Sequence, residues 1–306
     1  MRRGRGLAAV RWLVVILSVV ALGAIGVRWL AGGPESPRTG AATTPSPLAT
    51  GEAAPASCVQ PGPWTPIAQA NAASLHDLAW PLSGREMFGW EIYAPLVGRE
   101  LASACPADSE GFAAALARWQ AAHGLPASGR MDAQGFQTLW VGMLRRRPFV
   151  QAMNTGCPPP PAASELELAR PDETFAGQTT IMAGSKALQA FRTMLAAARA
   201  DAPAIRDDPQ ALKIISGFRA PQSDGTDCPP GPACFNLTRA NCSAHRTGLA
   251  FDLYVGAAPG RDPTSTEDDN RLYQSRTLAY RWLVAHAAQY GFLPYPYEPW
   301  HWEWAG

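Results

Sequence analysis

Apolar positions recur with a helical period in several segments of the chain. Phe112, Leu116 and Trp119 fall on one face of a predicted helix at 111–123. A tight loop and a second short helix, which begins after Asp132, follow this segment. The same period predicts further helices at 186–198 and 278–290.

Two segments near the C-terminus instead alternate between apolar and polar side chains, as half-buried strands do. Leu249, Phe251 and Leu253 alternate with Ala250, Asp252 and Tyr254, so the Asp252 carboxylate projects from the opposite face of the predicted strand. The segment 300–304 alternates again, and 211–216 is typical of a short buried strand. Helices mixed with short strands predict the α+β class.

The N-terminus carries a targeting pattern. Four arginines between residues 2 and 11 precede an apolar run at 12–27. A spanning helix needs about 20 apolar residues and tolerates roughly 17, so we expect a signal-anchor or transmembrane segment at 1–30. The positive-inside rule then puts the rest of the chain outside the cytoplasmic membrane, as a membrane-anchored protein of the cell envelope. If the segment were cleaved, the protein would be secreted.

Composition divides the remaining chain. The segment 31–57 is rich in Pro, Ser, Thr and Gly and is predicted to be a linker. A small helical domain is expected at 58–150. Four consecutive prolines fall in a second linker at 151–165, which leaves 166–306 as a second, larger domain.

Charge and cysteine content narrow the function further. The 306 residues include 26 basic and 25 acidic side chains, and this balance disfavours nucleic acid as a partner. All six cysteines lie beyond the apolar run, which indicates disulfides in an oxidising compartment. Cys58 with Cys105 is a plausible pair, and two of the three cysteines between 228 and 242 could close a loop.

Candidate chemistry begins with a loop histidine and a strand carboxylate. His245 and Asp252 are both zinc-type ligands, but this spacing alone is a weak signal. Among the five histidines, His301 remains as the third candidate because His76, His123 and His286 fall in helical or surface segments. Glu298 and Glu303 lie close to His301 in sequence. Strict strand alternation would put Glu303 on the face of His301 and Glu298 on the opposite face. On geometry alone, Glu303 would then compete with Glu298 for the role of a base beside the metal.

Three separated motifs resemble a known family. Ser216-Gly217-Phe218-Arg219 resembles Ser-Gly-Tyr-Arg, residues 243–252 fit Ser-x-His-x-x-Gly-x-Ala-x-Asp, and residues 298–301 fit Glu-x-Trp-His. In this order, they are similar to the motifs of the D-Ala-D-Ala carboxypeptidases and dipeptidases of the vancomycin-resistance type, which are zinc peptidases. Phage endolysins and the hedgehog signalling fold are related to that family.

The resemblance implies a fold, a metal and a role for each residue. A small antiparallel sheet with flanking helices would carry one Zn²⁺ on His245, Asp252 and His301. Glu298 would take a proton from the metal-bound water and pass it to the leaving amine, and it would lie in a turn before the strand. Arg219 would face the scissile carbonyl oxygen. Ser243 would contact the substrate or a group that surrounds one of the zinc ligands.

Residues 58–150 resemble in part the small peptidoglycan-binding domain that accompanies many cell-wall hydrolases. The Phe-x6-Trp-Gln-x3-Gly-Leu-Pro pattern of residues 112–126 carries this second likeness. Because so small a domain needs its large side chains in the core, we expect the aromatics to be buried there.

The two resemblances imply that peptidoglycan stem peptides are the partner of the chain. The leading hypothesis is a D-alanyl-D-alanine carboxypeptidase. A peptidoglycan endopeptidase is the alternative within the same chemistry. A non-catalytic wall-binding protein with a residual zinc site is the alternative from another class.

Overall fold

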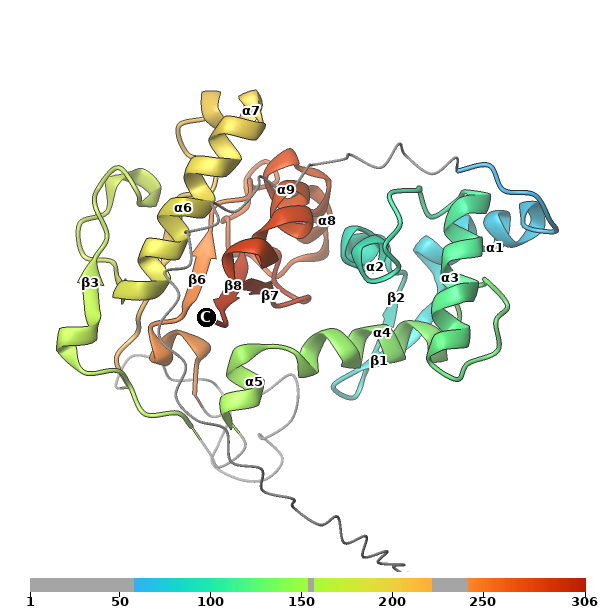
Figure 1. Ribbon diagram of the computed structural model, residues 1–306, viewed down its shortest axis with the longest axis horizontal. Helices are drawn as coiled ribbons and strands as arrows, with labels where there is room; N and C mark the ends of the chain where they lie inside the picture. The colour runs from blue at the N-terminus through green and yellow to red at the C-terminus, as the bar shows by residue number, and fades with distance from the viewer. Residues whose placement is uncertain (1–57, 154–156, 222–241) are drawn as a thin grey trace, which may run out of the picture. The chain divides into compact units, whose positions relative to one another are not determined.

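Helices and small antiparallel sheets alternate in the computed structural model of the chain, which describes residues 58–153, 157–221 and 242–306 (Figure 1). This mixture agrees with the predicted α+β class. No helix in those three ranges is long and apolar enough to cross a membrane. The predicted membrane segment at 1–30 and the linker at 31–57 lie outside the described residues.

Helices predominate in the first part of the described chain. The Ser109 hydroxyl caps α3 (Glu110–Ala122) by accepting a hydrogen bond from the Phe112 amide at 3.2 Å. The Asp132 carboxylate caps α4 (Ala133–Arg145) by accepting a hydrogen bond from the Gly135 amide at 2.7 Å. The two helices predicted here are therefore confirmed. The helices of this part are α1 (Thr65–Asp77), the 3-10 helix η1 (Glu91–Tyr93), α2 (Ala94–Glu100), α3 (Glu110–Ala122), α4 (Ala133–Arg145) and α5 (Pro148–Ala152).

A β-hairpin also lies in this part, which the sequence predicted as helical only. Strands β1 (Ala79–Leu82) and β2 (Arg85–Phe88) pair antiparallel. Ser83 and Gly84, with φ of 49° and 81°, form the two-residue turn between them. The strands escaped prediction because each has four residues and β1 contains Pro81, a residue that argues against a strand.

The second part carries the larger sheet. Its strands run in the order β5-β6-β8-β7 and all neighbours are antiparallel, as the resemblance implied. The strands of this part are β3 (Leu166–Leu168), β4 (Met182–Gly184), β5 (Ile214–Ser216), β6 (Ala250–Leu253), β7 (Phe292–Pro294) and β8 (His301–Trp304). Its α-helices are α6 (Ser185–Asp201), α7 (Pro203–Asp207), α8 (Asp268–Arg276) and α9 (Leu278–His286).

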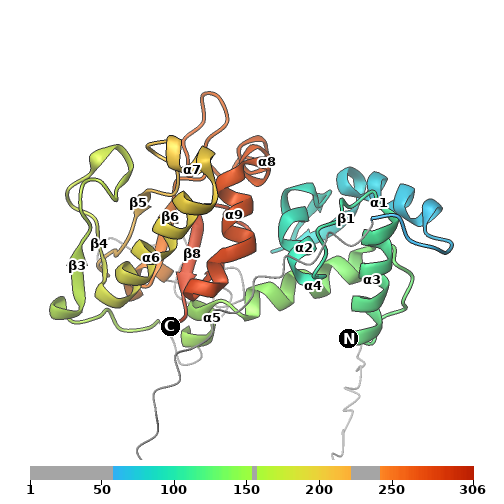
Figure 2. The same cartoon turned by 45° about the horizontal axis from the view of Figure 1, so that its top comes forward.

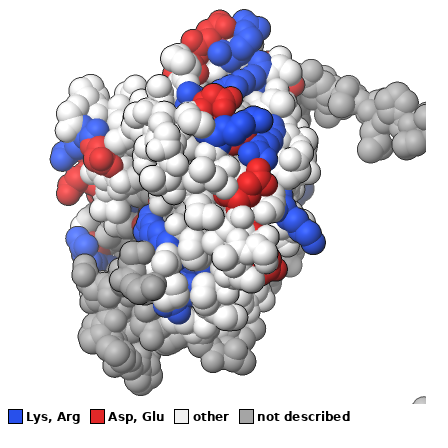
Figure 3. All heavy atoms as spheres, turned by 90° about the vertical axis from the view of Figure 1, so that its left-hand side faces the viewer, with Lys and Arg blue, Asp and Glu red and all other residues white. Residues whose placement is uncertain are grey.

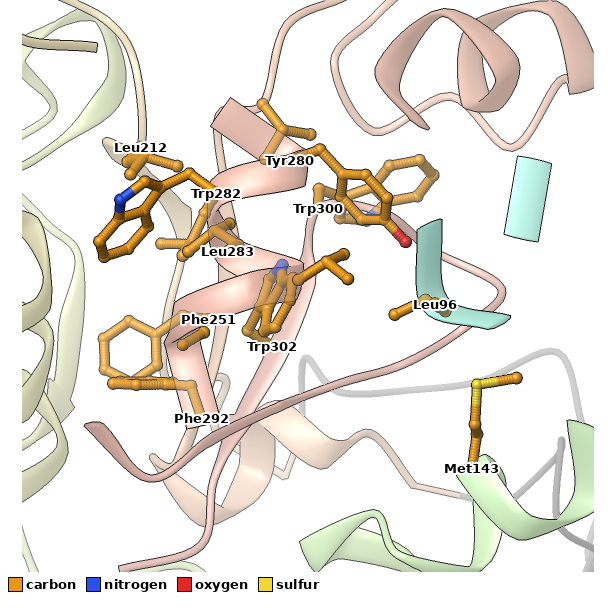
Figure 4. Packing of buried hydrophobic residues seen from close by; sticks show 14 of the residues in the cluster. Leu96, Met143, Leu212, Phe251, Tyr280, Trp282, Leu283, Phe292, Trp300 and Trp302 are labelled. Atoms are coloured by element: carbon orange, nitrogen blue, oxygen red, sulfur yellow. The ribbon is translucent and has the colours of Figure 1, made fainter. Parts of the chain in front are cut away.

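Aromatic side chains fill the core beside this sheet. Figure 4 shows Phe251 and Phe292 next to Trp302, and the two phenyl rings meet edge to face at 5.6 Å. Leu96 and Met143, from α2 and α4, belong to the same buried cluster. The core thus extends from the helical part to the sheet. The division of the chain into domains at 151–165 stays a prediction.

Two disulfides join described residues. Cys58 and Cys105 are bonded, which confirms the predicted pair. Cys242 is bonded to Cys157, 85 residues earlier in the chain. Cys228 and Cys234 lie outside the described residues. On the face that Figure 3 shows, basic and acidic side chains are interspersed, in keeping with the net charge of +1.

Candidate metal centre

His245 lies in a short 3-10 turn, η6 (Ala244–Thr247), just before β6. The Ser243 hydroxyl caps the turn by accepting the His245 amide at 3.2 Å. Gly248 ends the turn with φ of 70°, and a Cβ there would lie 3.2 Å from the Gly184 nitrogen. A left-handed, crowded position of this kind favours glycine. Ser243 therefore shapes the turn that holds His245, while its predicted contact with substrate stays a prediction.

The sheet brings the other two candidate ligands together. Asp252 on β6 pairs directly with His301, the first residue of β8. One ligand atom from each of His245, Asp252 and His301 can be chosen so that all three lie within 4.8 Å of one another. Their side chains are 3–5 % exposed. The structure thus gathers the three residues predicted as ligands into one buried group.

One carboxylate oxygen lies between the two imidazoles. Asp252 Oδ1 is 3.2 Å from His245 Nε2 and 3.0 Å from His301 Nδ1. Tetrahedral zinc with bonds of about 2.0–2.1 Å would require neighbouring ligand atoms about 3.3 Å apart. The two separations from Asp252 Oδ1 are close to this value, and the third pair of ligand atoms lies within 4.8 Å.

The outer nitrogens of both rings have partners that fix their tautomers. His245 Nδ1 donates to the Gly217 carbonyl at 2.6 Å, and His301 Nε2 donates to Glu303 Oε1 at 3.2 Å. In the neutral rings, Nε2 of His245 and Nδ1 of His301 then carry no hydrogen, and their lone pairs point at the Asp252 carboxylate. Three acceptors that converge in this way call for a cation among them, either a proton or a metal.

Without a metal, the Asp252 carboxylate and the two imidazoles stabilise each other's charged forms. Burial raises the pKa of Asp252, but His245 and His301 outweigh this effect and the net pKa is lowered. Burial lowers the pKa of His301, whereas its hydrogen bonds to Asp252 and Glu303 raise it to a net value of about 9. A divalent cation would replace the proton that this arrangement favours on His301.

Arg219 holds the second oxygen of the carboxylate. Its guanidinium donates to Asp252 Oδ2 at 3.0 Å and to the Ser216 hydroxyl at 3.0 and 3.1 Å. The Arg219 side chain is 41 % exposed, so it marks a side of the site that solvent reaches. Its predicted role toward a scissile carbonyl stays a prediction.

Glu298 lies in the turn before β8, as the resemblance implied, and the His301 amide donates to its carbonyl at 2.9 Å. Glu298 Oε2 is 4.0 Å from His301 Nδ1, the nitrogen that faces Asp252. Burial raises the pKa of Glu298, and the effect outweighs the opposing charge of His301. The side chain is 29 % exposed. Glu298 therefore sits between the ligand group and solvent, where a proton acceptor would be useful.

Glu303, the rival base, is committed elsewhere. Its Oε1 accepts from His301 Nε2 and from Arg147, and its Oε2 accepts the Phe149 amide at 2.9 Å. Burial raises its pKa, but Arg147 and His301 bring the net value down to about 2. Glu303 contacts the outer nitrogen of His301 and is 2 % exposed. This geometry favours Glu298 over Glu303 as the base.

Sequence reasoning missed Arg147 and the Gly217 carbonyl. Neither an arginine nor a glycine carbonyl is distinguished in the sequence as a partner of a metal-binding residue. Arg147 also lies 156 positions from its partner Glu303. One signal was available for Arg147: Pro148 follows it, and a residue before proline is restricted to extended backbone. Arg147 has φ −60° and ψ 128°, and it separates α4 from α5.

Comparison with known families agrees with this geometry. Residues 238–306 match the family model VanY, described as D-alanyl-D-alanine carboxypeptidase. This segment is therefore similar to the members of that family. The VanY match includes the three candidate ligands and Glu298, whereas Arg219 and Arg147 precede it. Neither the curated proteins nor the solved structures contain a significant match to the chain.

Proposed function

We propose that the chain is a zinc-dependent D-alanyl-D-alanine carboxypeptidase that releases the terminal D-Ala of peptidoglycan stem peptides. The observation that carries this proposal is the buried His245–Asp252–His301 group, with Glu298 on its accessible side, inside a VanY segment. Two imidazoles, one carboxylate and an open position are the donor set of catalytic zinc. We place the reaction outside the cytoplasmic membrane, in line with the N-terminal targeting pattern.

Zinc bound to the three ligands would polarise the scissile carbonyl and lower the pKa of the attacking water. The chain supplies the proton transfers. Glu298 accepts a proton from the water and returns it to the leaving amine, and its raised pKa suits both steps. Arg219 keeps Asp252 oriented and presents positive charge at the exposed side of the site, where an oxyanion would form.

Two alternatives remain as outcomes of the test. An endopeptidase would use the same residues and differ in the bond that it cuts. A non-catalytic wall-binding protein would need the metal ligands alone, and the placement of Glu298 beside the ligand group disfavours it.

The test is product analysis by mass spectrometry after the purified full-length chain and zinc are mixed with muropeptides that carry pentapeptide stems. We expect loss of one alanine from the stem C-terminus. Cleavage within the stem or cross-bridge would indicate an endopeptidase. Unchanged muropeptides, with zinc bound, would overturn the enzymatic proposal.

A further inference from the structure

Arg147 is a buried arginine that the proposed chemistry does not use. It is the last of three consecutive arginines, and its side chain is 8 % exposed. Arg146, its neighbour, is 49 % exposed and pairs with Glu100 at 2.6 Å. The chain therefore turns one arginine of the three into the interior. Buried arginines are rare unless they are paired, so this placement requires an explanation.

The partner of Arg147 is the carboxylate that holds His301. Arg147 Nε donates to Glu303 Oε1 at 2.9 Å, and Nη2 donates to the same oxygen. That oxygen also accepts from His301 Nε2 at 3.2 Å. The contacts thus run from Arg147 through a single carboxylate to the imidazole of a candidate metal ligand.

A second contact joins Arg147 to the same histidine. Its guanidinium lies over the ring of Tyr295, with Cζ 3.8 Å from the ring centroid. Tyr295 meets the His301 ring edge to face at 5.9 Å, and its amide donates to the His301 carbonyl at 3.0 Å. The planar guanidinium therefore supports His301 by two routes, which a lysine ammonium could not reproduce.

The backbone around Arg147 is built for this contact. Pro148 begins α5 and holds Arg147 in extended backbone, which ends α4 and redirects the chain toward β8. The backbone amide of Phe149, two residues after Arg147, donates to Glu303 Oε2 at 2.9 Å. In both ribbon views α5 lies near the C-terminal end of the chain (Figures 1 and 2). Arg147 and Phe149 thus satisfy both oxygens of one buried carboxylate.

We propose that Arg147, through Glu303, is a positioning residue for His301 and that the metal site therefore depends on a segment outside the VanY match. The pair holds the Nε2–H tautomer of His301 and leaves Nδ1 free to bind the ion. This inference rests on the proposed zinc site. Removing a contact that orients a metal-bound histidine typically weakens metal affinity or activity by about 10–100-fold.

The test measures zinc affinity of the full-length chain by competition with a chromophoric chelator, and the visible absorption of its cobalt-substituted form. We expect Arg147→Met to bind zinc 10–100-fold more weakly and to change the cobalt spectrum. Arg147→Lys should recover part of the affinity. The matched control is Arg192→Met, which removes a partner at 2.6 Å from Glu173, a carboxylate as buried as Glu303. It should leave both readouts unchanged.

A double variant separates positioning from folding. Arg147→Met alone leaves the Glu303 charge buried without its cation, which can destabilise the chain severely. Arg147→Met with Glu303→Met removes both charges and should restore stability, yet its zinc affinity should stay low because His301 has lost its acceptor. Wild-type affinity in this double variant, or in a folded Arg147→Met, would overturn the inference. A wild-type chain that binds no zinc would instead overturn the proposed function.

Discussion

The two disulfides offer a comparison in which similar losses of stability should have different effects on the metal site. Cys58–Cys105 closes a separation of 47 residues, and Cys157–Cys242 closes one of 85. From loop-closure entropy, replacing each pair by serine should lower the free energy of unfolding by about 4.0 and about 4.6 kcal/mol, respectively. Stability alone would barely distinguish the two variants.

Their positions differ in a way that should matter. Cys242 precedes His245 by three residues, is 2 % exposed, and packs with Phe149, Ala244 and Ala250. The bond to Cys157 therefore holds the entry to the turn that presents His245. Cys58 and Cys105 lie beside Gly111 in α3, away from any candidate ligand.

The assay pairs urea denaturation with zinc titration of both double-serine variants. We expect zinc affinity to fall about tenfold, the lower end of effects from supporting contacts, when Cys157 and Cys242 are replaced. Replacement of Cys58 and Cys105 should leave zinc affinity at the wild-type value. Equal losses of affinity in the two variants would refute the reasoning, because the bond beside His245 would then contribute only general stability.

Three further substitutions test individual contacts. Glu298→Gln should keep zinc, measured by atomic absorption, and lose about 10²–10⁴-fold in turnover of a pentapeptide stem; full turnover would remove Glu298 as the base. Arg219→Lys should weaken zinc binding in calorimetry by about tenfold, because the ammonium cannot contact Ser216 and Asp252 as a fork. Gly217→Ala would place a Cβ 2.3 Å from the Met182 carbonyl oxygen, so we expect a loss of about 1–3 kcal/mol in thermal unfolding.

Local patterns predicted the elements that have local causes. The helices α3 and α4 begin directly after Ser109 and Asp132, whose side chains cap them as their residue types suggest. The alternation around Asp252 predicted β6, and the structure shows that all four of its residues are buried, on both faces. The resemblance then indicated which residues would meet, and the register of Asp252 opposite His301 shows how.

Contacts between distant segments could not be predicted in this way. Neither periodicity nor spacing relates Arg147 to Glu303, or Cys157 to Cys242, because the fold alone brings these pairs together. Alternation did place Glu303 on the face of His301, but it could not show that the Arg147 guanidinium binds the Glu303 carboxylate.

The location of the metal tests the central claim most directly. Anomalous diffraction at the zinc edge, from crystals grown with one equivalent of zinc, should show a single ion about 2.0–2.2 Å from His245 Nε2, Asp252 Oδ1 and His301 Nδ1. Glu298 should lie beside its remaining position. An ion bound elsewhere, or no ion within reach of these three side chains, would contradict the account.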